Sequence, residues 1–241
     1  MNKKLLKNSI ITFLATASIA FAADHGDHDH AGHSHGALPV SQAEQAAMTP
    51  DSVLADLKAG NMRYVEGKPE APNIAGRIEA ATKGQFPKAY ILSCVDSRVP
   101  VETVFDQSIG DIFVGRVAGN VENEDQLGSM EFASAVAGVK LIVVMGHEAC
   151  GAVKGACDHV EVGNLTMLLE KIAPAVTSVE GHEDRSSKNK AFVEEVIHAN
   201  VARTVSDVTT RSAVIADLVA QGKLKVVGAY YSLEDGTVRF M

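Results

Sequence analysis

The stretch AYILSCVDSRVP, residues 89–100, joins an apolar run directly to reactive side chains. The run at 89–93 is short and rich in β-forming residues, which predicts a buried strand. Cys94, Asp96 and Arg98 follow it at once. In open α/β sheets, functional groups gather at the carboxyl ends of strands. The stretch therefore predicts a strand and a candidate site at its end.

A second apolar run, KLIVVMG at 140–146, ends in a similar way. His147 follows it directly, and Cys150 comes three residues later. Gly146 and Gly151 flank this pair and would permit a tight turn that aims both side chains the same way. The glycines do not indicate a phosphate loop, because the G-K-[ST] ending is absent.

If these two strands are neighbours, their ends bring Cys94, His147 and Cys150 together. Two thiolates and an imidazole are three ligands of a tetrahedral zinc site with the fourth position open. Two other interpretations stay open at this point. Cys94 and Cys150 could form a disulfide, and His147 could be an ordinary structural histidine.

The remaining runs predict the fold class. Strands are expected at DIFVGR, 111–116, and KVVGAYY, 225–231, with TVRFM, 237–241, as an edge strand after a turn. Helical patterns cover 125–139, 164–179 and 188–221. Continuous apolar strands separated by helices favour an α/β fold, with a mainly parallel central sheet flanked by helices and an antiparallel edge strand.

The charge balance excludes one large class of partner. The chain of 241 residues has a formal net charge of -8, and no Lys/Arg cluster stands outside its first residues. Binding to nucleic acid needs such a cluster, so we expect no nucleic-acid partner. Hydrophobic residues make up 46% of the chain, which is enough for a globular core.

The N-terminus is typical of an export signal. Three lysines precede an apolar run, and Ala20-Phe21-Ala22 fits a signal-peptidase site. We predict a signal peptide at 1–22, a flexible His-rich segment at 23–40 and a catalytic domain at 41–241, located in the periplasm without a membrane contact after cleavage. An N-terminal membrane anchor is the alternative. Five histidines in 24–36 either capture metal loosely or belong to a solvated linker.

Asp96 and Arg98 favour a catalytic use of the metal. A carboxylate close to a metal thiolate is repelled by it, and a nearby arginine offsets this repulsion and can fix the carboxylate through a bidentate pair. A fixed, ionised carboxylate beside an open metal position can accept the proton of an activated water. The pattern Cys-x-Asp-Ser-Arg, then GDIFVGRVAGN at 110–120, then His-x-x-Cys-Gly resembles the β-class carbonic anhydrases in order and spacing. The resemblance covers roughly residues 48–241.

This resemblance carries definite implications. It implies reversible hydration of carbon dioxide to bicarbonate and a proton, by a zinc hydroxide that an Asp-Arg dyad orients, in a homodimer or homotetramer. The residues that it implies are the zinc ligands Cys94, His147 and Cys150, the catalytic dyad Asp96 and Arg98, and the substrate-binding residues Gln85, Phe113 and Gly151. Two other functions stay open: hydrolysis of carbon disulfide or carbonyl sulfide on the same fold, and periplasmic zinc binding, which needs no dyad.

Overall fold

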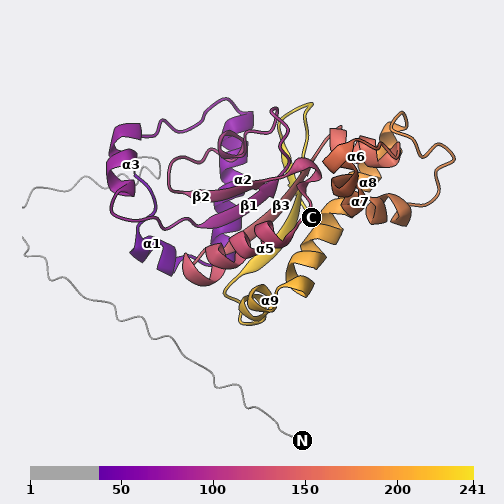
Figure 1. Ribbon diagram of the computed structural model, residues 1–241. Coiled ribbons are helices and arrows are strands. Elements are labelled where there is room, and N and C mark those ends of the chain that lie inside the picture. Colours follow the sequence, from indigo (N-terminus) through magenta and orange to yellow (C-terminus); the bar gives the residue numbers. More distant parts are fainter. Residues whose placement is uncertain (1–37) are drawn as a thin grey trace, which may run out of the picture. The chain divides into compact units, whose positions relative to one another are not determined.

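The computed structural model describes residues 38–241. The predicted signal peptide and nearly all of the predicted His-rich segment lie outside the described residues, so both stay predictions. The described part contains a five-stranded sheet in the order β2-β1-β3-β4-β5 (Figure 1). Its strands are β1 Ala89–Ser93, β2 Ile112–Arg116, β3 Leu141–His147, β4 Lys225–Tyr231 and β5 Val238–Phe240.

The sheet confirms the predicted fold class. β2, β1, β3 and β4 pair in parallel, and β5 runs antiparallel to β4 at one edge. The expected strands at 89–93 and 225–231 coincide with β1 and β4. β3 begins and ends one residue later than the apolar run at 140–146 and so includes His147.

Helices and turns fill the connections. Their bounds are α1 Gln42–Ala47, α2 Pro50–Val65, α3 Ile74–Ala81, α4 Val101–Val104, α5 Glu124–Glu131, α6 Gly151–Cys157, α7 Gly163–Ser178, α8 Lys190–Arg211 and α9 Ala213–Ala220. A 3-10 turn spans Ala118–Asn120, and a π-helical turn spans Phe132–Val136. Within residues 38–241, no helix is both long enough and apolar enough to cross a bilayer.

Two predicted helical stretches differ from the structure. The stretch 125–139 is α5 followed by the π-helical turn, rather than one α-helix. The stretch 188–221 is divided at Ser212, where α8 ends and α9 begins. The reason is local: the Ser212 hydroxyl accepts the N–H of Ile215, which caps the new helix, and donates to Glu131 at 2.6 Å.

Both faces of the sheet are covered, as a parallel sheet requires. On one face, Ile91 and Val143 pack in a cluster with side chains of α2 and α4. On the other, Leu92 and Val144 pack with side chains of α5, α8 and α9. Alternate residues of each strand therefore point into opposite halves of the core. α6 and α7 pack beyond the carboxyl edge of the sheet, in a third cluster that includes Cys94 and Cys150.

The contact between α2 and the chain after α4 generates a stability prediction. Gly60 lies inside α2, and a Cβ added there would overlap the backbone carbonyl of Phe105. We expect Gly60→Ala to lower the free energy of unfolding by about 1–3 kcal/mol, because a backbone atom cannot move aside cheaply. Urea denaturation measures the change.

Gly128 is the matched control for this substitution. It also lies inside a helix, α5, but it is exposed and a Cβ there would contact nothing. Alanine favours a helix interior over glycine by about 1 kcal/mol. Gly128→Ala should therefore leave stability unchanged or raise it slightly. Equal effects of the two substitutions would contradict the close approach at Gly60.

Candidate metal centre

Three potential metal ligands meet at the carboxyl edge of the sheet. Cys94 follows β1 directly, His147 ends β3, and Cys150 immediately precedes α6. β1 and β3 are paired with Ser93 opposite Met145, so the two ends lie side by side. The Sγ atoms and the nearer ring nitrogen all lie within 4.8 Å of one another, and all three residues are buried. Among residues 38–241, this is the one such group of three or more His, Cys, Asp or Glu side chains.

The two cysteines form a thiol pair rather than a disulfide. Cys94 and Cys150 are both free, so the disulfide alternative does not occur in the structure. The hydrogen bond between the two sulfurs lowers the pKa of Cys94 to about 4 and, together with burial, raises that of Cys150 above its ordinary value. Cysteine binds a metal cation as the thiolate, so both sulfurs have to be deprotonated when they bind one.

The ring of His147 is oriented for coordination. Its Nδ1 lies 2.9 Å from the carbonyl oxygen of Glu148, which only accepts, so Nδ1 carries the proton and donates. The other nitrogen, Nε2, is buried and has no hydrogen-bond partner among the described residues. A purely structural histidine would be expected to satisfy both nitrogens, because an unpaired buried acceptor costs free energy.

These residues fit a divalent metal ion. The unpaired Nε2 of His147 faces two free sulfurs. The Nδ1–H of the same ring donates to a backbone carbonyl, as the second nitrogen of metal-binding histidines usually does. Two sulfurs and one imidazole nitrogen suit zinc, whereas Mg²⁺ and Ca²⁺ prefer oxygen ligands. With these three side chains as ligands, a tetrahedral zinc site would have its fourth position open.

Asp96 and Arg98 form a bidentate ion pair at the rim of this cluster. Arg98 Nε lies 2.9 Å from Asp96 Oδ1, and Arg98 Nη2 lies 2.7 Å from Asp96 Oδ2. The backbone N–H of Arg98 also donates to Oδ1 at 2.9 Å. Oδ2 lies 3.7 Å from Nε2 of His147, so the carboxylate borders the ligand cluster. The Arg98 hydrogen bonds hold the pKa of Asp96 well below its usual range.

Glu148 braces the turn that carries the second and third ligands. Its side-chain Oε2 accepts the backbone N–H groups of Leu233 at 2.8 Å and Glu234 at 3.2 Å, in the turn between β4 and β5. Its own N–H donates to the carbonyl of Tyr231. Glu148 could not be singled out from the sequence, because its partners are backbone groups far away along the chain.

Arg116 and Gly119 support the first ligand. Arg116 Nε donates to the carbonyl of Cys94 at 2.9 Å, and Arg116 Nη2 donates to the carbonyl of Asp96. The N–H of Gly119 lies 3.4 Å from the Sγ of Cys94. Gly119 has a φ of 71°, in the region that favours glycine. Both residues belong to GDIFVGRVAGN, one of the three segments that carry the resemblance to the family.

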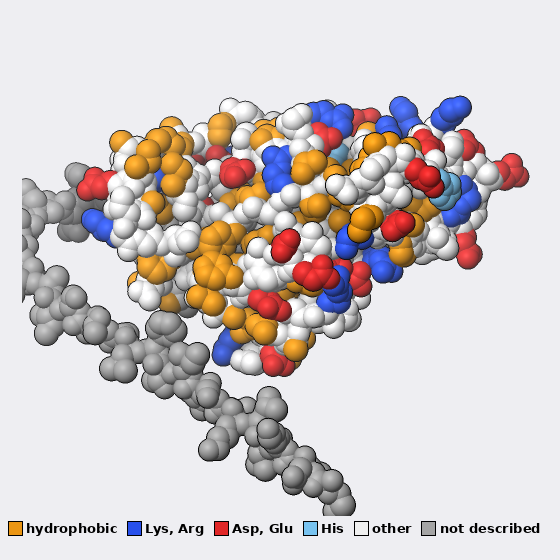
Figure 2. All heavy atoms as spheres, viewed as in Figure 1, with side chains coloured by type: hydrophobic (Ala, Val, Ile, Leu, Met, Phe, Trp, Pro, Cys, Tyr) orange, Lys and Arg blue, Asp and Glu red, His pale blue; other side chains and the backbone are white. Residues whose placement is uncertain are grey.

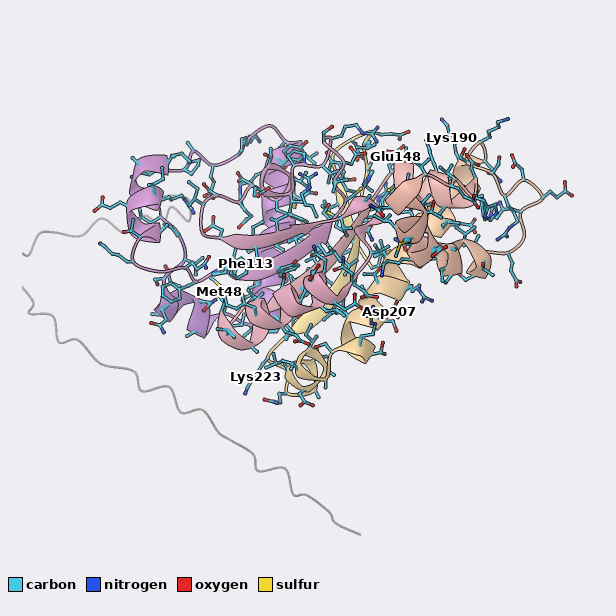
Figure 3. The ribbon with its side chains drawn as sticks, in the orientation of Figure 1. Met48, Phe113, Glu148, Lys190, Asp207 and Lys223 are labelled. Atoms are coloured by element: carbon cyan, nitrogen blue, oxygen red, sulfur yellow. The ribbon has the colours of Figure 1, made fainter. Side chains whose placement is uncertain are left out.

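The three expected substrate-binding residues lie in different places. Gly151 begins α6 beside Cys150 and so adjoins the cluster. Gln85 is exposed in the loop before β1, at the opposite end of that strand from Cys94. Phe113 is the second residue of β2, opposite Tyr90, and its ring lies 6.1 Å from that of Phe132. In Figure 3, Phe113 and Glu148 lie toward opposite ends of the strands. One chain therefore does not bring Gln85 and Phe113 to its own ligand cluster.

Comparison with known proteins connects this arrangement to a family. The family model described as carbonic anhydrase matches residues 89–238. Carbonic anhydrase 2 of Mycobacterium tuberculosis is 40% identical over 186 residues, which cover 75% of this chain and 87% of that protein. A carbonic anhydrase of Mycolicibacterium smegmatis is 41% identical over 188 residues, which cover 76% of this chain and 88% of that protein.

Solved structures agree with the sequence relatives. The β-carbonic anhydrase CafA of Aspergillus fumigatus superposes with a TM-score of 0.60 at 25% identity, over 79% of this chain and 89% of that one. A tetrameric β-carbonic anhydrase of Sordaria macrospora shares the fold, with a TM-score of 0.61 at 22% identity, over 79% of this chain and 95% of that one. The chain belongs to the β-class carbonic anhydrase family.

Proposed function

We propose that this chain binds Zn²⁺ through Cys94, His147 and Cys150 and catalyses the reversible hydration of carbon dioxide to bicarbonate and a proton. The observation that carries the proposal is the buried, unpaired Nε2 of His147, which faces two free sulfurs within 4.8 Å. Relatives at 40% identity named carbonic anhydrase support the reaction.

The residues around the ligands have complementary roles in this proposal. Bound zinc would supply a Lewis acid that lowers the pKa of a water molecule from about 16 toward neutrality. Asp96, ionised and held by Arg98, only accepts hydrogen bonds. It would accept a hydrogen bond from the attacking oxygen. This bond would orient the oxygen so that one of its lone pairs points at the carbon atom of the substrate.

Burial supports the same chemistry. The side chain of His147 is fully buried, and Cys94 and Cys150 are nearly so. Electrostatic interactions are stronger in such a poorly hydrated environment than in water. Gly151 carries no side chain, and a Cβ there would contact nothing, so the space beside Cys150 stays open. We propose that this space, next to the Gly151 N–H, accommodates the carbon dioxide or bicarbonate.

Metal analysis combined with a carbon dioxide hydration assay tests the proposal. We expect the purified protein to contain one zinc ion per chain and to hydrate carbon dioxide. Cys150→Ser should lose both properties, because a hydroxyl is a poor ligand for zinc. Asp96→Asn should keep the zinc and lose activity by about 100-fold or more, because the amide no longer accepts the hydrogen in the same way.

Cys157 supplies the control for the ligand substitution. It is also a buried, free cysteine, and burial raises its pKa to about 11, but it lies outside the ligand cluster. Cys157→Ser should therefore keep both zinc and activity. A protein that holds zinc but hydrates no carbon dioxide would contradict the proposal. Sulfide release from carbon disulfide or carbonyl sulfide by that protein would favour the hydrolase alternative.

The pairing of Asp96 with Arg98 predicts a pH-dependent stability. Arg98 lowers the folded-state pKa of Asp96 below the unfolded value of about 4. The ionised carboxylate therefore stabilises the fold above pH ~4, and this contribution is lost as the pH falls toward the folded pKa. We expect Arg98→Ala to be less stable than wild type at pH 7, by a margin that shrinks at pH 3. Urea denaturation at both pH values measures the margin.

Arg203 supplies the control for this measurement. It pairs with Asp207 at 3.4 Å along α8, in an exposed geometry that is worth at most about 1 kcal/mol. Arg203→Ala should change stability little at either pH. If the margin for Arg98→Ala were the same at pH 7 and pH 3, the carboxylate would not depend on Arg98 for its low pKa.

We also propose that the enzyme is a homodimer or a homotetramer. β2 is an edge strand, and beside it lies a hollow of about 740 Å³ lined by residues that include Phe113, Arg116 and Phe132. Phe132 is 49% exposed and Val136 is 74% exposed, and Figure 2 shows hydrophobic side chains around the end of α5. Since Gln85 and Phe113 lie away from the ligands of their own chain, they could contact substrate only in the site of a second copy.

Sedimentation equilibrium tests this assembly. We expect wild type to be dimeric or larger, and Phe132→Glu to shift it toward the monomer by burying a charge in the contact. Met167→Glu is the control, because Met167 is 67% exposed on α7, outside the residues that line the hollow. A monomeric wild-type protein would contradict the proposal.

A further inference from the structure

Asn200 is a buried amide for which the proposed reaction provides no role. It lies on α8 and is 1% exposed. Its Nδ2 donates to the carbonyl of Gly119 at 2.8 Å. Its Oδ1 is buried and has no hydrogen-bond partner within residues 38–241. A buried amide whose oxygen has no hydrogen bond lowers the stability of the fold. We therefore ask what the bond from Asn200 to Gly119 contributes in return.

The explanation lies in what Gly119 does. Its N–H is the backbone group that donates to the Sγ of Cys94 at 3.4 Å. Gly119 has a left-handed φ of 71° between the neighbouring turn residues. The N–H and the carbonyl of Gly119 belong to successive peptide groups that meet at its Cα, and glycine can take up many combinations of φ and ψ. An anchor on the carbonyl fixes the second of these peptide groups, so it limits the φ and ψ of Gly119 and, through them, the direction of its N–H. Asn200 supplies this anchor from another part of the chain.

α8 also supports the segment that delivers His147. Gly146 precedes this ligand, and a Cβ added there would lie 2.7 Å from Val201 Cγ2 and 3.0 Å from Ile197 Cγ2. The helix turn that contains Asn200 is therefore packed against the end of β3 while its amide holds the 118–120 turn. One helix thus contacts both the strand end that carries His147 and the turn whose N–H donates to Cys94.

We propose that Asn200 is a positioning residue of the metal centre, which holds the backbone at Gly119 in the conformation in which the Gly119 N–H donates to the Cys94 sulfur. An N–H bond to a thiolate withdraws electron density from the sulfur and fixes its direction. Both effects change how strongly the sulfur binds a cation, as contacts outside the ligand set generally do. This inference rests on the proposed metal centre and adds a residue to it.

Cobalt substitution tests the inference with a spectroscopic readout. In the protein loaded with Co²⁺, the thiolate-to-cobalt charge-transfer band reports the electron density on the sulfurs. Asn200→Leu keeps the number and branching of the side-chain heavy atoms but cannot donate, so we expect the band to move to longer wavelength. Competition with a chelator should show an affinity for Zn²⁺ that is about 10- to 100-fold lower. Asn200→Ser, whose hydroxyl is too short to reach the Gly119 carbonyl, provides a second variant if the first does not fold.

Asn61 provides the matched control. It is also a buried asparagine, at 6% exposure, and its Nδ2 donates to the carbonyls of Val104 and Gly236. It lies on α2, which covers the other face of the sheet. Asn61→Leu and Asn61→Ser should lower stability without moving the cobalt band.

The outcomes separate this inference from the proposed function. If wild type binds Co²⁺ and the folded Asn200 variants show the wild-type band and affinity, the positioning role is wrong and the metal centre stands. Equal changes in the Asn61 variants would also overturn it, because they would reveal a general loss of stability. If wild type binds neither Co²⁺ nor Zn²⁺, the proposed metal centre fails and the inference fails with it.

Discussion

The in-register parallel pairing of β1 with β3 is the constraint on which the rest of the site depends. Ser93 lies opposite Met145, so Cys94 and His147 emerge at the same edge. Side chains alternate between the two faces of a strand, and a slip of one residue would therefore turn Cys94 away from the histidine. The apolar side chains of both strands prevent such a slip, because it would exchange the residues packed on α2 with those packed on α8. The strand register that packs the core is thus also the register that brings the ligands together.

The three ligand side chains do not satisfy one another's hydrogen-bonding capacity, which costs free energy unless a cation joins them. The Nε2 of His147 is buried with no hydrogen-bond partner among residues 38–241, and the interaction between the two sulfurs lowers the pKa of Cys94 while it raises that of Cys150. A cation that binds the folded chain and not the unfolded one would pair with this nitrogen and with both sulfurs, and would stabilise the fold by mass action. The hydrogen bonds of Glu148 and Arg116 keep the ligands in place despite this cost, because they act on the backbone on either side of the cluster.

The sequence was most informative where a pattern and a function coincide in one segment. β1 and its trailing Cys94 were predictable because an apolar run and a reactive side chain are adjacent, and sheet geometry brings such ends together. The division at Ser212 was not predictable, because the helical pattern of apolar residues continues through the serine that ends α8 and caps α9. Glu148 and Asn200 bond to backbone groups that are distant in the sequence, so local periodicity could not predict these contacts. The position of Gln85 depends on the path of the loop before β1, which local periodicity does not predict either.

The loop after β1 shows how one segment can carry charges that repel each other. Cys94 and Asp96 both face the cluster, while Val95 between them is 57% exposed, so the chain continues the alternation of a strand beyond its last sheet pairing. A thiolate and a carboxylate on the same side would separate if nothing held them. Two arginines hold them in different ways: Arg98 neutralises the carboxylate directly, and Arg116 binds the backbone carbonyls of Cys94 and Asp96. Because Arg116 fixes the backbone, Arg98 is left to fix the carboxylate, and loss of either arginine should disturb a different part of the site.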